Sequence, residues 1–90
     1  MKIVINRCYG GFSITYACAK KLGIDKYDAS DYRTDERLIK MVEENADEVS
    51  GHFSKLSVVE IPDNKTDYEV NEYDGYESIT YVVDGLLHHI

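Results

Sequence analysis

The N-terminal stretch KIVINRCYGGFS, residues 2–13, constrains the fold more than any other part of the chain. The β-branched run Ile3 to Ile5 directs apolar side chains to both sides of an extended chain, so we expect a strand that is covered on both faces. The run leads through Gly10-Gly11 to Ser13, a residue type that commonly caps a helix. Glycines allow close approach of another backbone, and a helix that begins beyond them directs unpaired N–H groups at the loop. The stretch therefore predicts a strand, a tight loop suited to an anion, and a helix.

The rest of the chain predicts one further helix and three further strands, which gives the order β-α-α-β-β-β. Apolar residues at helical spacing, cap residues and glycine stops define the helices, and alternation of apolar and polar residues defines the strands. Residues 24–34 are polar and have no sustained period, so they predict a loop. The expected helices begin at Ser13 and at Thr34 or Asp35 and end at Gly23 and Gly51, and the expected strands cover residues 56–61, 68–73 and 76–83.

Residues 1–90 predict a single domain of the α+β class, in which two helices pack on one face of a mixed, mostly antiparallel sheet. The helical segment between the first strand and the strand at 56–61 is long enough for these two strands to lie parallel, through a right-handed crossover. The final segment, Leu86 to Ile90, either packs on the domain or is disordered.

The dipeptide Asp74-Gly75 separates the last two strands and is preferred in a two-residue type I′ hairpin turn. The resulting register places Glu72 opposite Glu77, on the face that Ile79 directs toward the core. Opposed carboxylates destabilise a hairpin by up to about 1 kcal/mol, so this pair needs an explanation. A basic partner, a cation or a general acid and base pair would each supply one, and solvation near an exposed turn is the structural alternative.

The charge of the chain narrows the classes of partner. Seventeen acidic residues against ten basic ones give a net charge of −7, which opposes binding to phosphate backbones, so we expect no nucleic-acid partner. No apolar run is long enough to span a bilayer, so we expect no membrane partner. Cys8 and Cys18, with no secretory segment before them, predict reduced thiols in a cytoplasmic protein. An acidic surface fits a partner with a basic groove, or serves solubility alone.

No residue pattern in the chain matches a catalytic or metal-binding motif. A thiol phosphatase needs an arginine six residues after its cysteine, and the residue at this distance from Cys8 is Ile14. Gly10-Gly11 lacks the flanking residues of a nucleotide-binding loop, and the histidines lack structural-zinc spacing. We therefore expect no catalytic residue, no metal ion and no cofactor.

The glycine loop is the best candidate for a small-ligand site. Arg7 and Tyr9 flank the loop, and together with its amides they suit a phosphate, a carboxylate or a stacked base. The structural alternative is that Arg7 pairs with a carboxylate and the glycines only turn the chain. The candidate ligand-binding residues are Arg7, Tyr9, Gly10, Gly11 and Ser13.

Three blocks of the sequence resemble a family of short proteins encoded by bacteriophages and prophages of Gram-positive bacteria. The blocks are KIVINRCYGGFS, then RTDERLIKMVEE with SGHFSKLSVVEIPD, and finally YEVNEYDGYESI, and together they cover most of the chain. The resemblance implies a one-domain phage accessory protein in the cytoplasm of the host cell. It carries no particular activity with it.

This origin favours a non-enzymatic binding protein that acts on a host factor, with an anti-defence inhibitor as one form. The YGGF loop and the EYDGYE hairpin would provide the contacts, and the expected partner-binding residues are Glu72, Tyr73, Asp74, Tyr76 and Glu77. One alternative is a sponge that sequesters a phosphate-bearing ligand, such as a nucleotide signal, at the Arg7 to Ser13 loop. This sponge would be a homo-oligomer, because one small chain encloses little. The other alternative is a small hydrolase or transferase that uses Cys8 or the two opposed glutamates.

Overall fold

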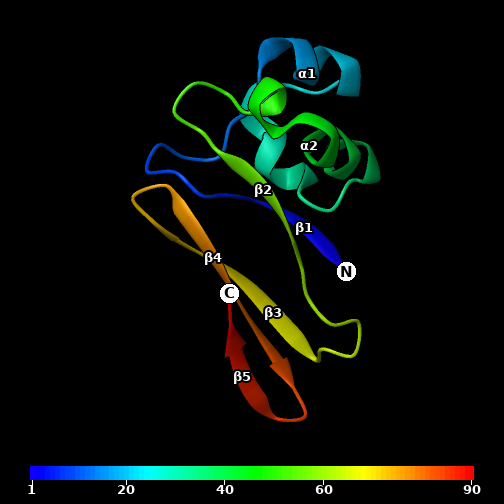
Figure 1. Ribbon diagram of the computed structural model, residues 1–90, viewed down its shortest axis with the longest axis vertical. Coiled ribbons are helices and arrows are strands. Elements are labelled where there is room, and N and C mark those ends of the chain that lie inside the picture. Colours follow the sequence, from blue (N-terminus) through cyan, green and yellow to red (C-terminus); the bar gives the residue numbers. More distant parts are fainter.

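The computed structural model describes all 90 residues, and Figure 1 shows the helices at one end of its long axis and the last strand toward the other. The strands form a two-stranded sheet and a separate three-stranded sheet. The predicted α+β class is therefore confirmed. In chain order the elements are β1 (Lys2–Asn6), α1 (Tyr16–Leu22), the 3₁₀ helix η1 (Lys26–Tyr32), α2 (Glu36–Val49), β2 (Leu56–Glu60), β3 (Asp67–Tyr73), β4 (Tyr76–Val83) and β5 (Leu86–His89).

β1 and β2 pair antiparallel, with Asn6 opposite Leu56, so the expected parallel pairing is wrong. The chain leaves β1 and enters β2 at the same end of the sheet, where the N–H of Arg7 donates to the carbonyl of Lys55 at 2.8 Å. The helical segment is thus an excursion over one face of this sheet and not a crossover. In place of one mixed sheet the chain forms two antiparallel sheets, β1-β2 and β3-β4-β5.

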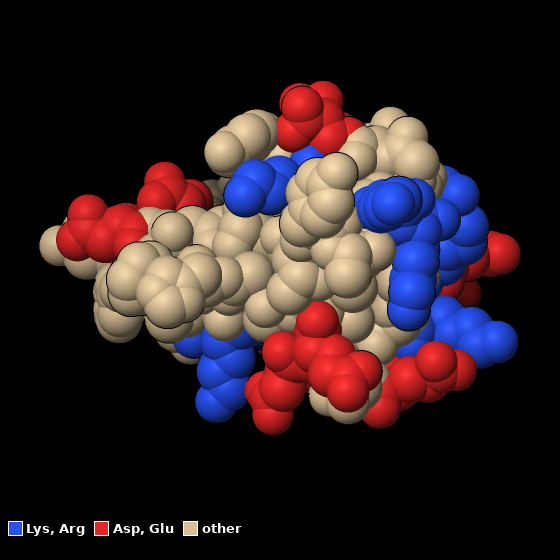
Figure 2. All heavy atoms as spheres, turned by 90° about the horizontal axis from the view of Figure 1, so that it is seen from above, with Lys and Arg blue, Asp and Glu red and all other residues tan.

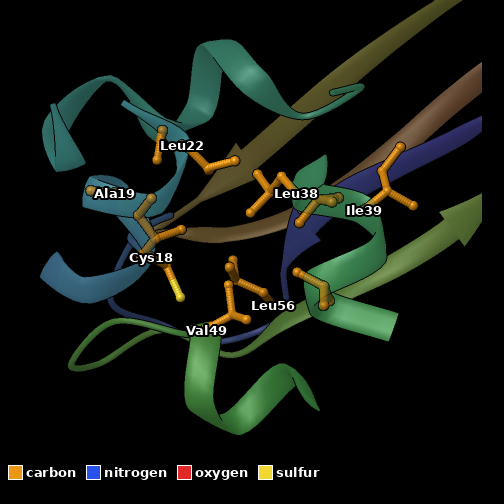
Figure 3. Packing of buried hydrophobic residues seen from close by; sticks show 11 residues of the cluster. Cys18, Ala19, Leu22, Leu38, Ile39, Val49 and Leu56 are labelled. Atoms are coloured by element: carbon orange, nitrogen blue, oxygen red, sulfur yellow. The ribbon is translucent and has the colours of Figure 1, made fainter. Parts of the chain in front are cut away.

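Both faces of β1 are buried, as its apolar run predicts. Val4 packs in a cluster with residues of all three helices and with Leu56. Figure 3 shows this cluster, with Leu56 labelled among members from α1 and α2. Ile3 and Ile5 point to the other side and pack with Ile79 of β4. The two-stranded sheet therefore separates two apolar clusters, with the helices on one side and the three-stranded sheet on the other.

α1 begins later than predicted, because the residues before it pair with the end of α2. The N–H of Thr15 donates to the carbonyl of Val49 at 3.0 Å, and Thr15 replaces Ser13 as the N-cap. The predicted stop at Gly23 is confirmed by its left-handed backbone, with a φ of 72°. A helix that begins at Tyr16 lies farther from the glycine loop than the sequence predicts.

Residues 24–34 were expected to form a loop, but most of them form η1, which buries Ala29. The side chain of Asp25 accepts from the N–H of Tyr27 at 2.9 Å and so starts this helix. Asp35 caps α2 as predicted. α2 ends at Val49, within one residue of the predicted end, because Ser50 has an extended backbone with a ψ of 131°. The N–H and the hydroxyl of Ser50 both donate to the carbonyl of Ala46 in the last turn.

The β3–β4 hairpin has the predicted register, with Glu72 opposite Glu77. Its two turn residues have positive φ, 51° at Asp74 and 90° at Gly75, as a type I′ turn requires. The final segment, for which packing and disorder were both open, forms the edge strand β5 beside β4.

The N-cap of α2 predicts a specific loss of stability in acid. Hydrogen bonds from Arg37 hold the pKa of the Asp35 carboxyl below its usual value. Ionised Asp35 therefore stabilises the folded state above the unfolded pKa of about 3.9, and this contribution is lost as the pH falls through the folded pKa. We expect Asp35→Asn, which keeps a cap acceptor, to lower the free energy of unfolding at neutral pH, and we expect its difference from the wild type to shrink steadily as the pH falls below the unfolded pKa. Urea unfolding as a function of pH measures this, and a difference that is independent of pH would contradict it.

Candidate functional site

The hairpin turn rests directly on the glycine loop. Gly75 lies so close to this loop that a Cβ atom on it would be 2.3 Å from the amide nitrogen of Gly11 and 2.8 Å from that of Gly10. No side chain fits between the two backbones. Because Gly75 also has a φ of 90°, the turn and the contact both require glycine here.

Asn6, at the end of β1, is completely buried and connects three segments. Its amide nitrogen donates to the carbonyl oxygens of Cys8 and Gly75, both at 2.7 Å. Its side-chain oxygen accepts from the N–H of Lys55 at 2.8 Å and from the hydroxyl of Ser54 at 3.3 Å. The glycine loop, the hairpin turn and the loop before β2 are thus held by one fully satisfied amide.

Glu77 is buried, with only 4% of its surface exposed, and forms a two-pronged ion pair with Arg33. Its Oε1 accepts from Nη1 of Arg33 at 2.7 Å and from the N–H of Asn6 at 2.7 Å, while Nη2 of Arg33 donates to its Oε2. Arg33 also closes the free edge of β1, since its carbonyl accepts from the N–H of Val4 at 2.9 Å. The expectation that Glu77 contacts a partner is wrong, because this carboxylate is enclosed by its own chain.

The two opposed glutamates therefore have separate roles. Arg33 neutralises Glu77, whereas Glu72 remains exposed and accepts from the N–H of Gly75 within the turn. Neither carboxylate is free to work with the other as an acid and base pair in this arrangement.

Arg7 links the glycine loop to the hairpin. Its Nη1 donates to the main-chain carbonyl of Glu77 at 2.9 Å, and its guanidinium lies 5.5 Å from the centre of the Tyr76 ring. The Tyr76 ring is in turn 5.3 Å from the ring of Tyr9. Arg7 is therefore occupied, although by a carbonyl and an aromatic ring and not by a carboxylate.

The candidate ligand-binding residues do not converge on a hollow. The N–H of Gly10 donates to the carbonyl of Cys8 at 2.9 Å, and Gly75 covers the amide of Gly11. The Ser13 side chain lies against Gly51. The larger hollows in the surface are lined by other residues. This geometry gives little support to a phosphate site in the loop.

The same contacts leave aromatic side chains exposed above them. Tyr9 and Tyr73 are 69% and 72% exposed, and the half-buried Tyr76 lies between them as the contact of Tyr9 and the strand partner of Tyr73. The exposed residue Asp74 borders this surface in the turn, and the exposed Glu72 lies beside it at the hairpin end, on the opposite face of the strand from Tyr73. We call these five residues, Tyr9, Glu72, Tyr73, Asp74 and Tyr76, the tip patch. In Figure 2 the hairpin end of the molecule, on the left, carries acidic groups beside uncharged surface.

Neither cysteine has the surroundings of a nucleophile. Cys8 is half-buried and makes no hydrogen bond to a His, Asp or Glu side chain, and Cys18 packs in the helical cluster (Figure 3). No group of three or more His, Cys, Asp or Glu side chains lies close enough together to hold a metal ion. None of the helices combines the length and the apolar composition that crossing a bilayer requires.

No protein-family model, no curated protein and no solved structure matches the chain.

Asn6 and Arg33 are the central residues that the sequence did not reveal. One signal pointed toward Arg33, since two opposed glutamates call for a cation. The chain offers ten Lys and Arg residues, however, and Arg33 lies in a segment that was expected to be a loop. Asn6 follows an apolar strand, and nothing in its local sequence indicates that its amide is buried.

Breaking the buried ion pair should be far more costly than breaking an exposed one. We expect Glu77→Gln to lower the free energy of unfolding by about 3 kcal/mol, because it leaves the Arg33 guanidinium without its counter-charge. The matched control is Asp35→Asn, which removes the carboxylate that pairs with the exposed Arg37 and should cost less than about 1 kcal/mol. Urea unfolding measures both, and equal losses would contradict the central role of Glu77.

The close contact between the turn and the glycine loop predicts that substitution of Gly75 lowers stability more than substitution of a glycine without such a contact. Gly75 and Gly85 both have positive φ, but only Gly75 touches another backbone. Alanine at either position costs about 1 kcal/mol of backbone strain. Gly75→Ala should lose a further 1–3 kcal/mol or so, because the added methyl group pushes the hairpin off the loop. Thermal unfolding of the two variants compares these losses, and similar melting temperatures would show that the close contact contributes nothing.

Proposed function

We propose that this chain is a non-enzymatic binding protein that contacts a host-cell protein through the tip patch. The observation that supports this most is the joining of two segments far apart in sequence into one surface. Tyr9 from the glycine loop and Tyr73 from the hairpin lie on either side of Tyr76, and both outer rings are largely exposed.

The contacts beneath the tip patch favour tight binding. Asn6, Glu77 and Arg33 fix the hairpin on the glycine loop, so the tyrosines are carried on a support held by buried hydrogen bonds. A preformed surface loses less conformational entropy when it binds. Tyrosine is also among the residues that most often dominate the energy of an interface.

The charge of the chain favours a partner with a basic surface. The tip patch carries the carboxylates of Glu72 and Asp74, and the whole chain has a net charge of −7. Long-range attraction between an acidic and a basic surface raises the rate of association. Repulsion between two acidic surfaces lowers that rate for acidic competitors.

The resemblance to phage-encoded proteins suggests the setting of this interaction. Two of the three similar blocks, KIVINRCYGGFS and YEVNEYDGYESI, are the segments that build the tip patch. We therefore place the protein in the cytoplasm of an infected bacterium, where occupying the basic groove of a defence protein would make it an inhibitor.

The alternatives have weaker support. Sequestration of a phosphate-bearing ligand would need the loop amides and Arg7 to be free, and both are engaged within the chain. Hydrolase or transferase activity would need a base near Cys8, or two cooperating glutamates. Glu77 is already paired with Arg33.

Affinity capture from lysate of a Gram-positive host tests the proposal. The test variant carries Tyr9→Ala and Tyr73→Ala. The control variant carries Tyr16→Ala and Tyr27→Ala, which removes two tyrosines from the helical end that are at least as exposed, at 72% and 83%. We expect the test variant to bind its captured partner at least about tenfold more weakly, as loss of interface tyrosines does, and the control variant to bind like the wild type.

The salt dependence of capture tests whether the partner has a basic surface. Capture should weaken as the salt concentration rises, because salt screens attraction between surface charges. Equal binding by the two double variants would contradict the tip patch as the contact surface. A phosphate-bearing small molecule that co-purifies with the chain and is lost in Arg7→Ala would favour the sponge instead.

A further inference from the structure

The outer edge of β5 is an unpaired sheet edge. Ile79 and Ile90 exchange both main-chain hydrogen bonds, which sets the alternation along β4 and β5. His88 and Leu86 therefore direct their N–H and C=O groups to β4, and Leu87 and His89 direct theirs away from it. No element of the chain lies beyond β5 in this sheet.

This edge differs in charge from the opposite edge of the same sheet. β3, the other edge strand, carries Asp67, Glu69 and Glu72, and acidic side chains on an edge oppose pairing with a second acidic chain. β5 has the sequence LLHH, without Asp or Glu, and all four side chains are exposed. The two leucines are 66% and 72% exposed, which is high for apolar side chains.

We infer that β5 is a dimer contact, in which two copies of this chain pair antiparallel about a two-fold axis at His88. In this register Leu87 of each copy lies opposite His89 of the other. The outward N–H and C=O groups of both residues then exchange hydrogen bonds, so no main-chain group in the middle of the edge is left unpaired. The two three-stranded sheets become one six-stranded sheet.

A second copy fits this edge better than another partner because the edge is self-complementary. The two-fold axis places each copy's Leu86 beside Ile90 of the second copy, so apolar side chains meet at both ends. The nearest acidic residue along the chain is Asp84, four residues from the axis. The two Asp84 residues would be about 27 Å apart at 3.4 Å per residue, well beyond the screening length of about 10 Å.

The position of β5 leaves room for the second copy. Figure 1 shows β5 toward the lower end of the molecule, away from the helices and on the outer side of β4. The tip patch lies at the other end of β4, where the hairpin turn is located. The dimer would therefore present two tip patches, one from each copy, on the same continuous sheet.

Replacing His88, the residue at the two-fold axis, by charged residues tests this arrangement. His88→Glu places two carboxylates directly opposite each other, and His88→Lys does the same with two ammonium groups. A contact between strands of four residues is small, so the wild type should form a weak dimer. Its average molecular mass in solution should rise from that of the monomer toward that of the dimer as the concentration rises to about 1 mM. Each variant should dissociate at least about tenfold more readily, and an equimolar mixture of the two should recover dimers. Sedimentation equilibrium measures all of these masses.

Two controls separate this contact from general effects. His52→Glu makes the same change at an exposed position outside β5 and should leave the dimer intact. Hydrogen exchange should slow at the amides of Leu87 and His89 when the concentration rises, and not at Val70 on the opposite edge. A wild type that stays monomeric throughout, or variants that dimerise as it does, would overturn the inference. Failure of the mixture to recover dimers would exclude a two-fold axis at His88.

Discussion

The buried carboxylate of Glu77 is the interaction on which the rest of the structure depends. A charge inside a protein is tolerated only with a counter-charge and hydrogen bonds, and Arg33 and the N–H of Asn6 supply them. Arg33 follows η1 in the helical layer, Asn6 is the last residue of β1 in the two-stranded sheet, and Glu77 lies in β4 of the three-stranded sheet. One carboxylate thus joins all three layers of a chain whose small size limits how much apolar surface it can bury.

Elements defined by local chemistry were predictable from the sequence. The Asp74-Gly75 turn and its hairpin register follow from backbone preferences within a few residues, and so does the cap at Asp35. Elements defined by distant contacts were not. The late start of α1 depends on pairing between Thr15 and Val49, 34 residues farther along the chain, and the antiparallel pairing of β1 and β2 depends on where the helical excursion returns.

The candidate site was predictable in part for the same reason. The glycine loop and the hairpin were each recognised as unusual, but nothing in the sequence indicates that they touch. Their contact explains both features. The glycines leave space for the close approach of the turn, and Glu77 of the hairpin pairs with Arg33 of the same chain. The features that suggested a ligand loop and an acidic pair are, in the structure, the means by which the protein holds itself together.

The backbone contact between Gly75 and the glycine loop separates the support of the tip patch from the side chains that it displays. Residues that touch backbone or are buried, such as Asn6 and Gly75, have little freedom to change. Tyr9 and Tyr73 extend from this support into solvent, where substitution costs the fold little. In the proposed function, substitutions in the tip patch would therefore change what is bound while the scaffold stays the same, as they do in the loops of an antibody domain.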